Sequence, residues 1–389
     1  MNQRLYYNDP YLREFEATVA SVETVDGRQC VRLDQTAFYP TSGGQPFDTG
    51  TLGRARVVEV IDADDGNVVH VVEGDVAVGV RITGSIDWAR RFDHMQQHTG
   101  QHVLSAAFER LLQTRTESFH LGADSATIDL GREVTPKDIA RAEDDANRVV
   151  WEDRPVRITF VDAAEAATLP LRKAPAREGT LRLIDVENYD LSACGGTHVE
   201  RTGAIGIIAV TGWERFKGGM RVGFVCGGRA LRAHRTLRDV TASNIRLLSV
   251  LPEELPAAIE RVQVEGKDAK RVIKGLQLKL AAHEAAALAD AAADRRVIRA
   301  LEGWDQNGLK TIASAVAERP GYVAALISRE SPSAIVVARH PESAVDCAAV
   351  LRKVVERFGG KGGGRPELAQ GGGLHGDPEA IAGYLIELL

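Results

Sequence analysis

The segment HMQQHTGQHVLSAAFERLL, residues 94–112, separates two kinds of pattern in the chain. Its apolar residues recur at helical spacings and no proline interrupts them, so it predicts a helix of roughly 18 residues that begins near Asp93. His98 and His102 lie four residues apart in this segment and therefore share one face of the helix. Two imidazoles on one face can converge on a single metal ion.

The residues before this helix favour a small all-β unit. Between Phe15 and Asp87, short segments rich in β-branched residues, such as RARVVEVI and NVVHVVEG, are separated by Asp-Gly and Gly-Asp turns. Short strands with close turns are typical of a barrel. A β-barrel domain is therefore predicted over residues 1–90.

The residues after the helix favour a mixture of helices and strands. A second helix is expected to begin at the Thr135-Pro136 pair, which supplies a cap and a favoured first residue, and to end near Trp151. Strand-like segments, SATIDL and VRITFV, flank this helix. We therefore predict an α+β fold class, with an α+β domain over residues 91–240.

The last part of the chain has a different composition. Residues 241–303 are rich in Ala, Leu, Lys and Glu, and their apolar residues step by three and four, which predicts a coiled-coil-like helical arm. Gly266 and His283 fit such a seam poorly, so we expect a hairpin or a packed arm instead of one long zipper. Residues 304–389 predict a small α/β domain. It contains the glycine-rich segment GGKGGGRPELAQGGG, residues 359–373.

Composition excludes several classes of protein. Hydrophobic residues make up 44% and charged residues 26% of the 389, which is the balance of a packed globular chain. No apolar run approaches the ~20 residues that cross a membrane, and the first residues lack the apolar centre of a signal peptide. Four cysteines without a framework spacing fit a reducing compartment. We therefore expect a cytoplasmic protein with no membrane segment.

A second pair of candidate ligands lies almost a hundred residues after the first. Cys194 and His198 are four residues apart in a CGGTH segment, whose glycines allow the backbone to turn tightly. With His98 and His102 they form a Cys/His₃ set, which matches the ligand preference of zinc. One histidine pair alone would favour ordinary packed or solvated side chains, but two pairs favour a metal site. His94, one turn before His98, is a further candidate ligand or hydrogen-bonding partner.

Three strings of this sequence resemble one known family. RRFDHMQQHTGQHVLSAAF (residues 90–108), CGGTHVERTGAIG (194–206) and TAFYPTSGGQPFDTG (36–50) resemble the editing domain of alanyl-tRNA synthetase and its free-standing relatives, the AlaX proteins. The resemblance extends from residue 1 to about 240. The glycine-rich C-terminal segment is similar to the DHH-associated domain of the same synthetase. With no aminoacylation module before the barrel, the sequence resembles a free-standing long AlaX protein.

The resemblance implies a reaction and a set of site residues. The family hydrolyses the ester of tRNA specific for alanine that carries a wrong amino acid, chiefly serine and in some members glycine. The residues carried over by motif are His98, His102, Cys194 and His198 as zinc ligands, and Thr36 and Gln45 as lining of the pocket for the aminoacyl group. Relatives commonly have three glycines before this glutamine, whereas this chain has SGGQ, which bears on substrate choice.

A zinc ion suits this reaction because it can polarise an ester carbonyl and lower the pKa of a bound water. A site that hydrogen-bonds a hydroxyl strongly rejects a ligand without one, so Thr36 is the candidate for choosing serine over alanine. Four protein ligands, however, are typical of structural zinc. One alternative is therefore a non-catalytic RNA-binding protein with a structural zinc. Another is a hydrolase of a phosphodiester or free ester, against which the absence of Asp-rich metal motifs argues.

Two basic stretches are candidate contacts for tRNA, although the whole chain has a net charge of -6. Residues 201–238 have a local charge of +7, and residues 352–365 have a charge of +4 beside the glycines. Lysine and arginine neutralise phosphates, and glycine amides can approach them closely. We expect tRNA as the partner, and we also consider a homodimer formed through the helical arm or the C-terminal domain.

Overall fold

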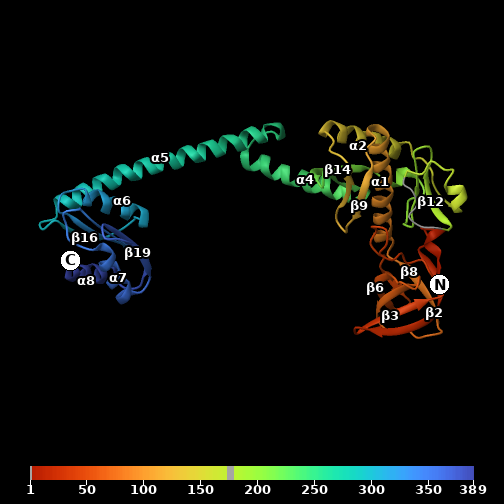
Figure 1. Cartoon of the computed structure of the whole chain (residues 1–389), viewed down its shortest axis with the longest axis horizontal. Coiled ribbons are helices and arrows are strands. Elements are labelled where there is room, and N and C mark those ends of the chain that lie inside the picture. Colours follow the sequence, from red (N-terminus) through yellow and green to blue (C-terminus); the bar gives the residue numbers. More distant parts are fainter. Residues whose placement is uncertain (1, 173–178) are drawn as a thin grey trace. The chain divides into compact units, whose positions relative to one another are not determined.

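The computed structural model describes residues 2–172 and 179–389. Within the chain, two compact units are formed by Met1–Ser243 and Asn244–Leu389. Figure 1 shows the helices and strands of each unit. In the described part of the chain, no helix is both long and apolar enough to cross a membrane.

The first unit begins with a closed barrel of six strands in the order β2-β3-β7-β6-β5-β8. The strands are β2 (Glu14–Val25), β3 (Arg28–Leu33), β5 (Gly50–Leu52), β6 (Ala55–Asp62), β7 (Val68–Glu73) and β8 (Arg81–Ile86). Neighbouring strands run antiparallel. Alternate side chains, among them Val19, Val31 and Val57, point inward and form the barrel core. The predicted barrel is confirmed.

Helix α1 (Trp88–Leu112) follows the barrel directly. Asp87 caps its N-terminus by accepting a hydrogen bond from the Arg90 backbone N–H, and Gln113 ends it in the left-handed conformation. The helix therefore has 25 residues, more than the sequence predicted, because its first turn precedes the periodic segment. Both histidines of the predicted metal pair are buried on it.

Two sheets and a second helix surround α1. The sheet β14-β15-β10-β9 and the sheet β11-β12-β13 are antiparallel. Their strands are β9 (Thr116–Leu121), β10 (Ala126–Leu130), β11 (Val156–Val161), β12 (Leu181–Val186), β13 (Asp190–Ala193), β14 (Ile208–Phe216) and β15 (Gly219–Cys226). Helix α2 (Pro136–Trp151) starts with the predicted cap, a reciprocal capping box between Thr135 and Asp138.

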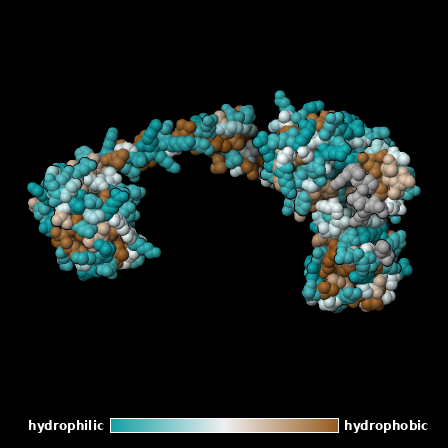
Figure 2. Space-filling view, in the orientation of Figure 1, coloured by the Kyte–Doolittle hydropathy of each residue, from teal (hydrophilic) through white to brown (hydrophobic). Residues whose placement is uncertain are grey.

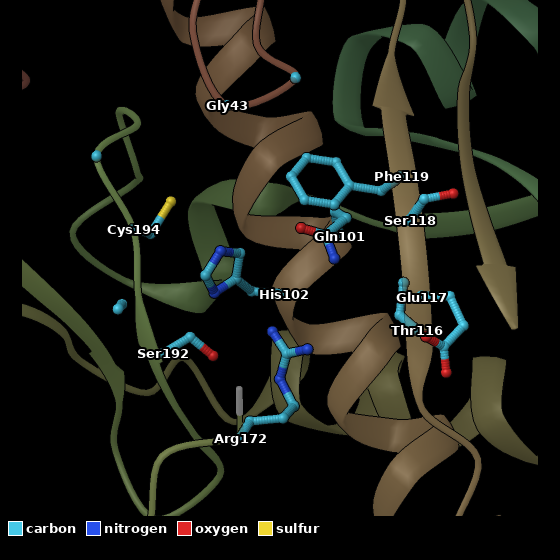
Figure 3. Close-up of a pocket in the computed structure, with 13 residues that line it drawn as sticks. Gly43, Gln101, His102, Thr116, Glu117, Ser118, Phe119, Arg172, Ser192 and Cys194 are labelled. Carbon is cyan, nitrogen blue, oxygen red and sulfur yellow. The ribbon is translucent and has the colours of Figure 1, made fainter. Parts of the chain in front are cut away.

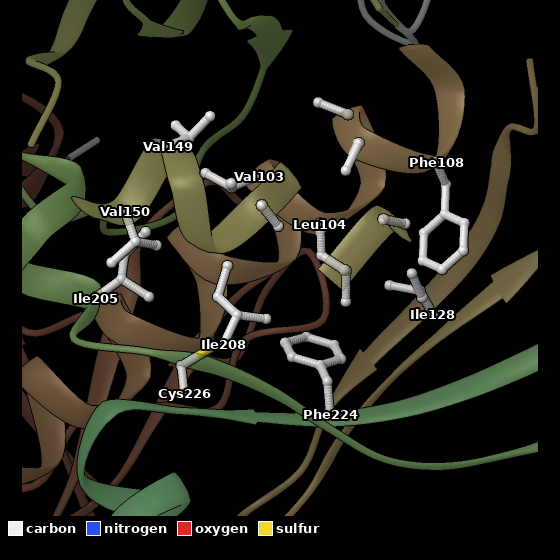
Figure 4. Close-up of a cluster of buried hydrophobic side chains, with 14 of the residues drawn as sticks. Val103, Leu104, Phe108, Ile128, Val149, Val150, Ile205, Ile208, Phe224 and Cys226 are labelled. Carbon is white, nitrogen blue, oxygen red and sulfur yellow. The ribbon is translucent and has the colours of Figure 1, made fainter. Parts of the chain in front are cut away.

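The core of this domain is built around α1. Leu104 and Phe108 of α1 pack with Ile128 of β10 and Phe224 of β15 in one buried hydrophobic cluster (Figure 4). Because the apolar face of α1 is fixed in this way, the turn that carries His98 and His102 is held in place next to β13.

Helix α4 (Gly227–Leu248) begins in the first unit, and α5 (Leu255–Asp290) belongs to the second. Of the two forms expected for the arm, a hairpin or a packed arm, the hairpin is wrong, because α5 is one uninterrupted helix of 36 residues. Gly266 is tolerated within it since its neighbours are strong helix formers and a side chain there would meet open space. Ile273, Leu276 and Leu280 of the predicted seam are more than half exposed. Figure 2 shows such apolar side chains among polar ones along this helix.

The second unit ends in a five-stranded sheet of order β16-β17-β18-β20-β19, in which only β16 and β17 are parallel. Its elements are β16 (Arg296–Leu301), α6 (Gln306–Ala317), β17 (Val323–Ser328), β18 (Ser333–Arg339), α7 (Cys347–Phe358), β19 (Lys361–Arg365), β20 (Leu368–Leu374) and α8 (Pro378–Leu388). One cluster joins α5 and α6 to the sheet, and another joins α7 and α8 to it.

The glycine-rich segment forms the hairpin β19-β20 at the edge of this sheet. Its glycines allow two backbones to approach closely. A Cβ on Gly362 would lie 2.7 Å from the Gln370 carbonyl oxygen, and one on Gly364 would lie 2.4 Å from the Ala369 Cα. Only glycine fits these two positions, so consecutive glycines here specify strand pairing.

Candidate metal centre

The four predicted ligands converge on one point. His98 and His102 project from α1, and Cys194 and His198 come from the turn after β13; their ligand atoms all lie within 4.8 Å of one another. The Cys194 Sγ is 3.4 Å from His98 Nε2 and 3.3 Å from His198 Nε2. The group is almost completely buried. Helix and turn, nearly a hundred residues apart in the chain, thus form one site.

Each of the three histidines has a polar neighbour at Nδ1, which leaves Nε2 for the centre of the group. These neighbours are Gln45 Oε1 at 2.8 Å from His98, Asp190 Oδ2 at 3.0 Å from His102 and Thr99 Oγ1 at 3.2 Å from His198. Such partners fix the orientation of a metal-binding imidazole and select its tautomer.

Gln45 connects the barrel to both parts of the metal centre. Its Oε1 accepts hydrogen bonds from the His98 ring and from the Thr197 backbone N–H at 3.1 Å, and its Nε2 donates to Thr197 Oγ1 at 2.8 Å. It is fully buried. Gln45 therefore touches a candidate metal ligand, and its predicted place in the pocket for the aminoacyl group stays a prediction.

The turn before Gln45 explains the SGGQ sequence. Ser42 and Gln45 exchange two backbone hydrogen bonds, and Gly43 and Gly44 between them have φ values of 50° and 83°. Both conformations are left-handed and favour glycine. Ser42 does not have a positive φ, so a third glycine is not required by the backbone there.

Thr36 lies outside the six barrel strands, on the short strand β4 (Gln35–Thr36), which pairs with β1 (Gln3–Arg4). Its fully buried hydroxyl is 2.8 Å from His70 Nε2 and accepts a hydrogen bond from the Phe38 backbone N–H at 3.1 Å. The structure thus gives this hydroxyl two partners within the protein. A contact between Thr36 and a substrate stays a prediction.

Burial and neighbouring charges change the protonation of the four ligands. Burial opposes ionisation of Cys194, but the adjacent His98 and His198 rings hold the pKa of its thiol well below the usual value. Burial also acts to lower the pKa of His102, but hydrogen bonds to Asp190 and Cys194 raise it to about 9. Burial and the adjacent His98 lower the pKa of His198 to about 3. The group thus combines a thiolate with an imidazole that stays neutral at pH 7.

A pocket of about 450 Å³ opens beside this group (Figure 3). It is lined by Gly43, Gly44, Gln101, His102, Thr116, Glu117, Ser118, Phe119, Arg172, Ser192, Ala193, Cys194 and Gly195. The buried Oε1 of Gln101 has no hydrogen-bond partner among the described residues. A buried acceptor without a partner is unfavourable, so it indicates a place where a ligand donates a hydrogen bond.

Several residues that hold the site were not found from the sequence. Two polar residues next to the helix histidines have other partners: Asp93 pairs with Arg229, and Gln97 hydrogen-bonds to the Cys226 backbone. His94 is buried but lies outside the four-residue group. Asp190 and Thr99, which do act on the ligands, could have been considered because each is a polar residue close in sequence to a ligand.

Arg182 also supports the turn of the metal centre. Its Nη1 donates to the carbonyl oxygens of Cys194 at 2.7 Å and Gly196 at 2.9 Å, and its Nε donates to the Tyr7 carbonyl at 2.9 Å. The guanidinium therefore fixes the CGG backbone against the N-terminal residues. This contact could not be predicted from the sequence, because Tyr7 lies far from Arg182 and the turn along the chain.

The basic stretch 201–238 is less positive in the structure than in the sequence. Six of its eight cations form ion pairs: Arg201 with Asp153, Arg215 with Glu133, Arg221 with Asp129, Arg229 and Arg232 with Asp93, and Arg238 with Asp239. Four of these carboxylates come from other parts of the fold. The local charge of +7 therefore overstates the free positive charge of this surface.

Three protein-family models match the chain. They are tRNA synthetases class II (A) at residues 5–90, the threonyl and alanyl tRNA synthetase second additional domain at 181–222, and the DHHA1 domain at 294–384. A solved structure, the C-Ala domain from Aquifex aeolicus alanyl-tRNA synthetase, is 29% identical, with 23% of this chain and 85% of that chain covered and a TM-score of 0.22.

Curated relatives are of two kinds. The alanine–tRNA ligases of Pyrococcus abyssi and Methanoculleus marisnigri are 34% and 36% identical over 94% and 95% of this chain, which spans only 41% of each ligase. The alanyl-tRNA editing protein AlaX-L of Pyrococcus horikoshii is 31% identical over 100% of this chain and 98% of its own length. The chain therefore belongs to the AlaX-L family of alanyl-tRNA editing proteins, with an editing region followed by a DHHA1 domain.

Proposed function

We propose that this protein is a hydrolase that acts in trans on mischarged tRNA specific for alanine. The bond cleaved is the ester between the tRNA and the wrong amino acid, with serine as the main substrate and glycine as a second one. The observation that carries the proposal is the buried Cys/His₃ group beside a pocket, in a chain that matches an alanyl-tRNA editing protein over its full length.

The four residues fit a zinc ion by the chemistry of their donors. His98, His102 and His198 offer nitrogen and Cys194 offers a thiolate, a set that zinc prefers. The Nδ1 partners already present match those of metal-binding histidines in general. When bound, zinc would supply a Lewis acid for the ester carbonyl and lower the pKa of a water.

The pocket residues have separate tasks in this proposal. Gln101 presents its unpartnered Oε1 as an acceptor for the ammonium group of the aminoacyl ester. Phe119 offers an aromatic ring on which the terminal base can stack. Gln45 and Asp190 hold the rings of His98 and His102 in place. Binding and orientation of the ester are thus supplied by the chain itself.

The proposal also assigns roles to the second unit and places the protein in the cytoplasm. We retain the division into domains at residues 1–90, 91–240, 241–303 and 304–389. Exposed lysines and arginines beside the β19-β20 hairpin are suited to tRNA phosphates. The exposed seam of α5 suits a homodimer. Because charged tRNA is used where proteins are synthesised, the protein is assigned to the cytoplasm.

Deacylation of seryl-, glycyl- and alanyl-tRNA by the purified protein, with and without a chelator, tests the proposal. We expect release of serine, slower release of glycine, no release of alanine, and loss of activity with the chelator. The rival function is an RNA-binding protein with a structural zinc, which is favoured by the full set of four ligands. Tight binding of tRNA without release of any amino acid would select that rival.

A further inference from the structure

We infer that Arg172 binds the phosphate of the last nucleotide of the tRNA while the same guanidinium holds Asp190 against the metal ligand His102. Arg172 is thus both a substrate-binding and a positioning residue. The inference rests on the proposed function, since it concerns the nucleotide that carries the ester.

A chain of contacts leads from the pocket to the metal centre. Arg172 Nε donates to Asp190 Oδ1 at 2.5 Å, and the other oxygen, Asp190 Oδ2, accepts from His102 Nδ1 at 3.0 Å. Ser192 Oγ donates to the same carboxylate at 3.0 Å. The Asp190 side chain is fully buried, so both of its oxygens depend on these partners. Removing Arg172 would free the carboxylate that orients His102.

The contact with Asp190 uses one of the three nitrogens of the Arg172 guanidinium. Only Nε of Arg172 forms a side-chain hydrogen bond to the described residues; the two terminal nitrogens have no such partner there. Figure 3 shows the guanidinium pointing into the pocket between Ser192 and Thr116. Among the described residues that line the pocket, Arg172 is the one lysine or arginine. Glu117, the acidic lining residue, forms no ion pair with it.

The size of the pocket and the donors of Arg172 match a nucleotide. A pocket of about 450 Å³ exceeds the needs of a seryl group and admits a nucleoside as well. The terminal nucleotide brings one phosphate, and the planar donors of arginine match phosphate in two parallel hydrogen bonds. Arg172 lies on the Nδ1 side of His102, whereas Nε2 faces the metal group. The arginine is therefore placed for the nucleotide part of the substrate and not for the ester carbonyl.

Two small substrates separate the two roles. One is the 3′-seryl ester of adenosine, and the other is the 3′-seryl ester of AMP, which differs only by its 5′-phosphate. The full-length zinc-loaded protein should hydrolyse the AMP ester with a kcat/KM about tenfold higher, as expected for a charged hydrogen bond. In Arg172→Gln this preference should disappear. Arg172→Lys, which keeps the charge but loses the planar donors, should recover part of it.

Asp190→Asn should lower the activity on both esters equally and keep the preference for AMP, because it affects His102 and not the phosphate. Arg157→Gln is the matched control: Arg157 pairs with Glu187 at 2.8 Å and does not line the pocket, so this variant should retain the preference. Equal loss on both esters in Arg172→Gln, or no loss on either, would overturn the inference.

A readout without catalysis keeps the inference separate from the proposed function. Calorimetry with non-hydrolysable amides, in which the 3′ oxygen is replaced by nitrogen, should show tighter binding of the AMP amide than of the adenosine amide. Arg172→Gln should remove this difference, and its zinc content shows whether the metal centre is intact. If the wild-type protein hydrolyses neither ester, deacylation of seryl-tRNA decides the proposed reaction, while the phosphate effect on binding still decides the role of Arg172.

Discussion

His102 shows how one residue connects the metal centre to the surrounding fold. Its Nε2 belongs to the four-ligand group, and its Nδ1 is held by the buried Asp190. The pKa of about 9 for this ring, where burial is outweighed by bonds to Asp190 and Cys194, means that the metal-free protein carries a protonated His102 at neutral pH. A metal ion must displace that proton.

We therefore predict that zinc affinity increases as the pH is raised from about 6.5 to about 9, with release of the His102 proton. The stability of the metal-free protein should change with pH in the opposite direction. Because the pKa of His102 is raised from 6.5 to about 9 on folding, protonated His102 stabilises the fold fully below pH 6.5, and this contribution is lost as the pH rises through about 9. Calorimetry in buffers of different ionisation enthalpy measures the proton. His102→Ala should lose zinc and deacylation together, and His120→Ala, on the exposed part of β9, is the control.

Thr36→Val tests the predicted role of this residue in selectivity. If Thr36 contacts the serine hydroxyl, the substitution should raise the activation free energy of seryl-tRNA hydrolysis by about 1 kcal/mol more than that of glycyl-tRNA hydrolysis. The valine also leaves His70 Nε2 and the Phe38 N–H without their partner, so the melting temperature must be measured alongside. Thr36→Ser, which keeps the hydroxyl, is the control. An equal loss on both substrates with a lower melting temperature would restrict Thr36 to supporting the barrel.

The sequence identified the four candidate metal ligands that converge but not the residues that orient them. The four ligands were found because pairs at spacing four carry a pattern in the sequence. Asp190, Thr99 and Arg172 have no such pattern, since their contacts depend on how β13 and the segment before β12 approach α1. Gln45 was found by motif, but its contact with His98 required the barrel to be placed against the helix.

Among the elements, the turn from Cys194 to His198 has little room for an added side chain at Gly196. A Cβ on Gly196 would lie 2.2 Å from His98 Cε1 and 3.0 Å from Gln45 Oε1. We predict that Gly196→Ala displaces the His98 ring and reduces zinc retained after dialysis by tenfold or more, as loss of a ligand's orientation does in general. Gly195→Ala is the matched control for zinc content, because its Cβ would meet Tyr7 at 3.7 Å, an ordinary contact. Equal zinc retention in the two variants would contradict the prediction.

The elements were predictable where local pattern decides them. The barrel, α1 and the capping box of α2 followed from alternation, helical spacing and cap residues. The β19-β20 hairpin did not, because glycine has no side chain to show a strand pattern and its pairing depends on the rest of the sheet. The unbroken α5 was missed because one glycine costs a helix only about 1 kcal/mol, which a helix of 36 residues tolerates.

All four candidate metal ligands lie in the first of the two compact units. We predict that a chain truncated after Ser243 keeps its zinc and its turnover at saturating tRNA, while it binds tRNA more weakly and with a shallower salt dependence, because fewer phosphate contacts release fewer counterions. Zinc analysis, steady-state kinetics and binding titrations at several salt concentrations measure these properties.

The control for truncation is the full-length protein with Lys361→Ala and Arg365→Ala, which removes the charges of β19 alone. In this variant we expect the same effects as in the truncated chain, weaker tRNA binding and a shallower salt dependence, but smaller in size. If truncation leaves the salt dependence unaltered, the second unit does not bind tRNA, and its exposed α5 seam would point to association between copies. If turnover at saturation collapses, the second unit instead orients the end of the tRNA.

The separation of the four ligands along the chain has a mechanical consequence. About ninety residues lie between His102 and Cys194, so a metal ion bound to both would act as a reversible cross-link that closes a long loop. Such a cross-link restricts the unfolded chain far more than the folded one, in which these residues already meet. The melting temperature should therefore follow the free zinc concentration, and the supply of zinc would set the lifetime of the folded protein as well as the state of its site.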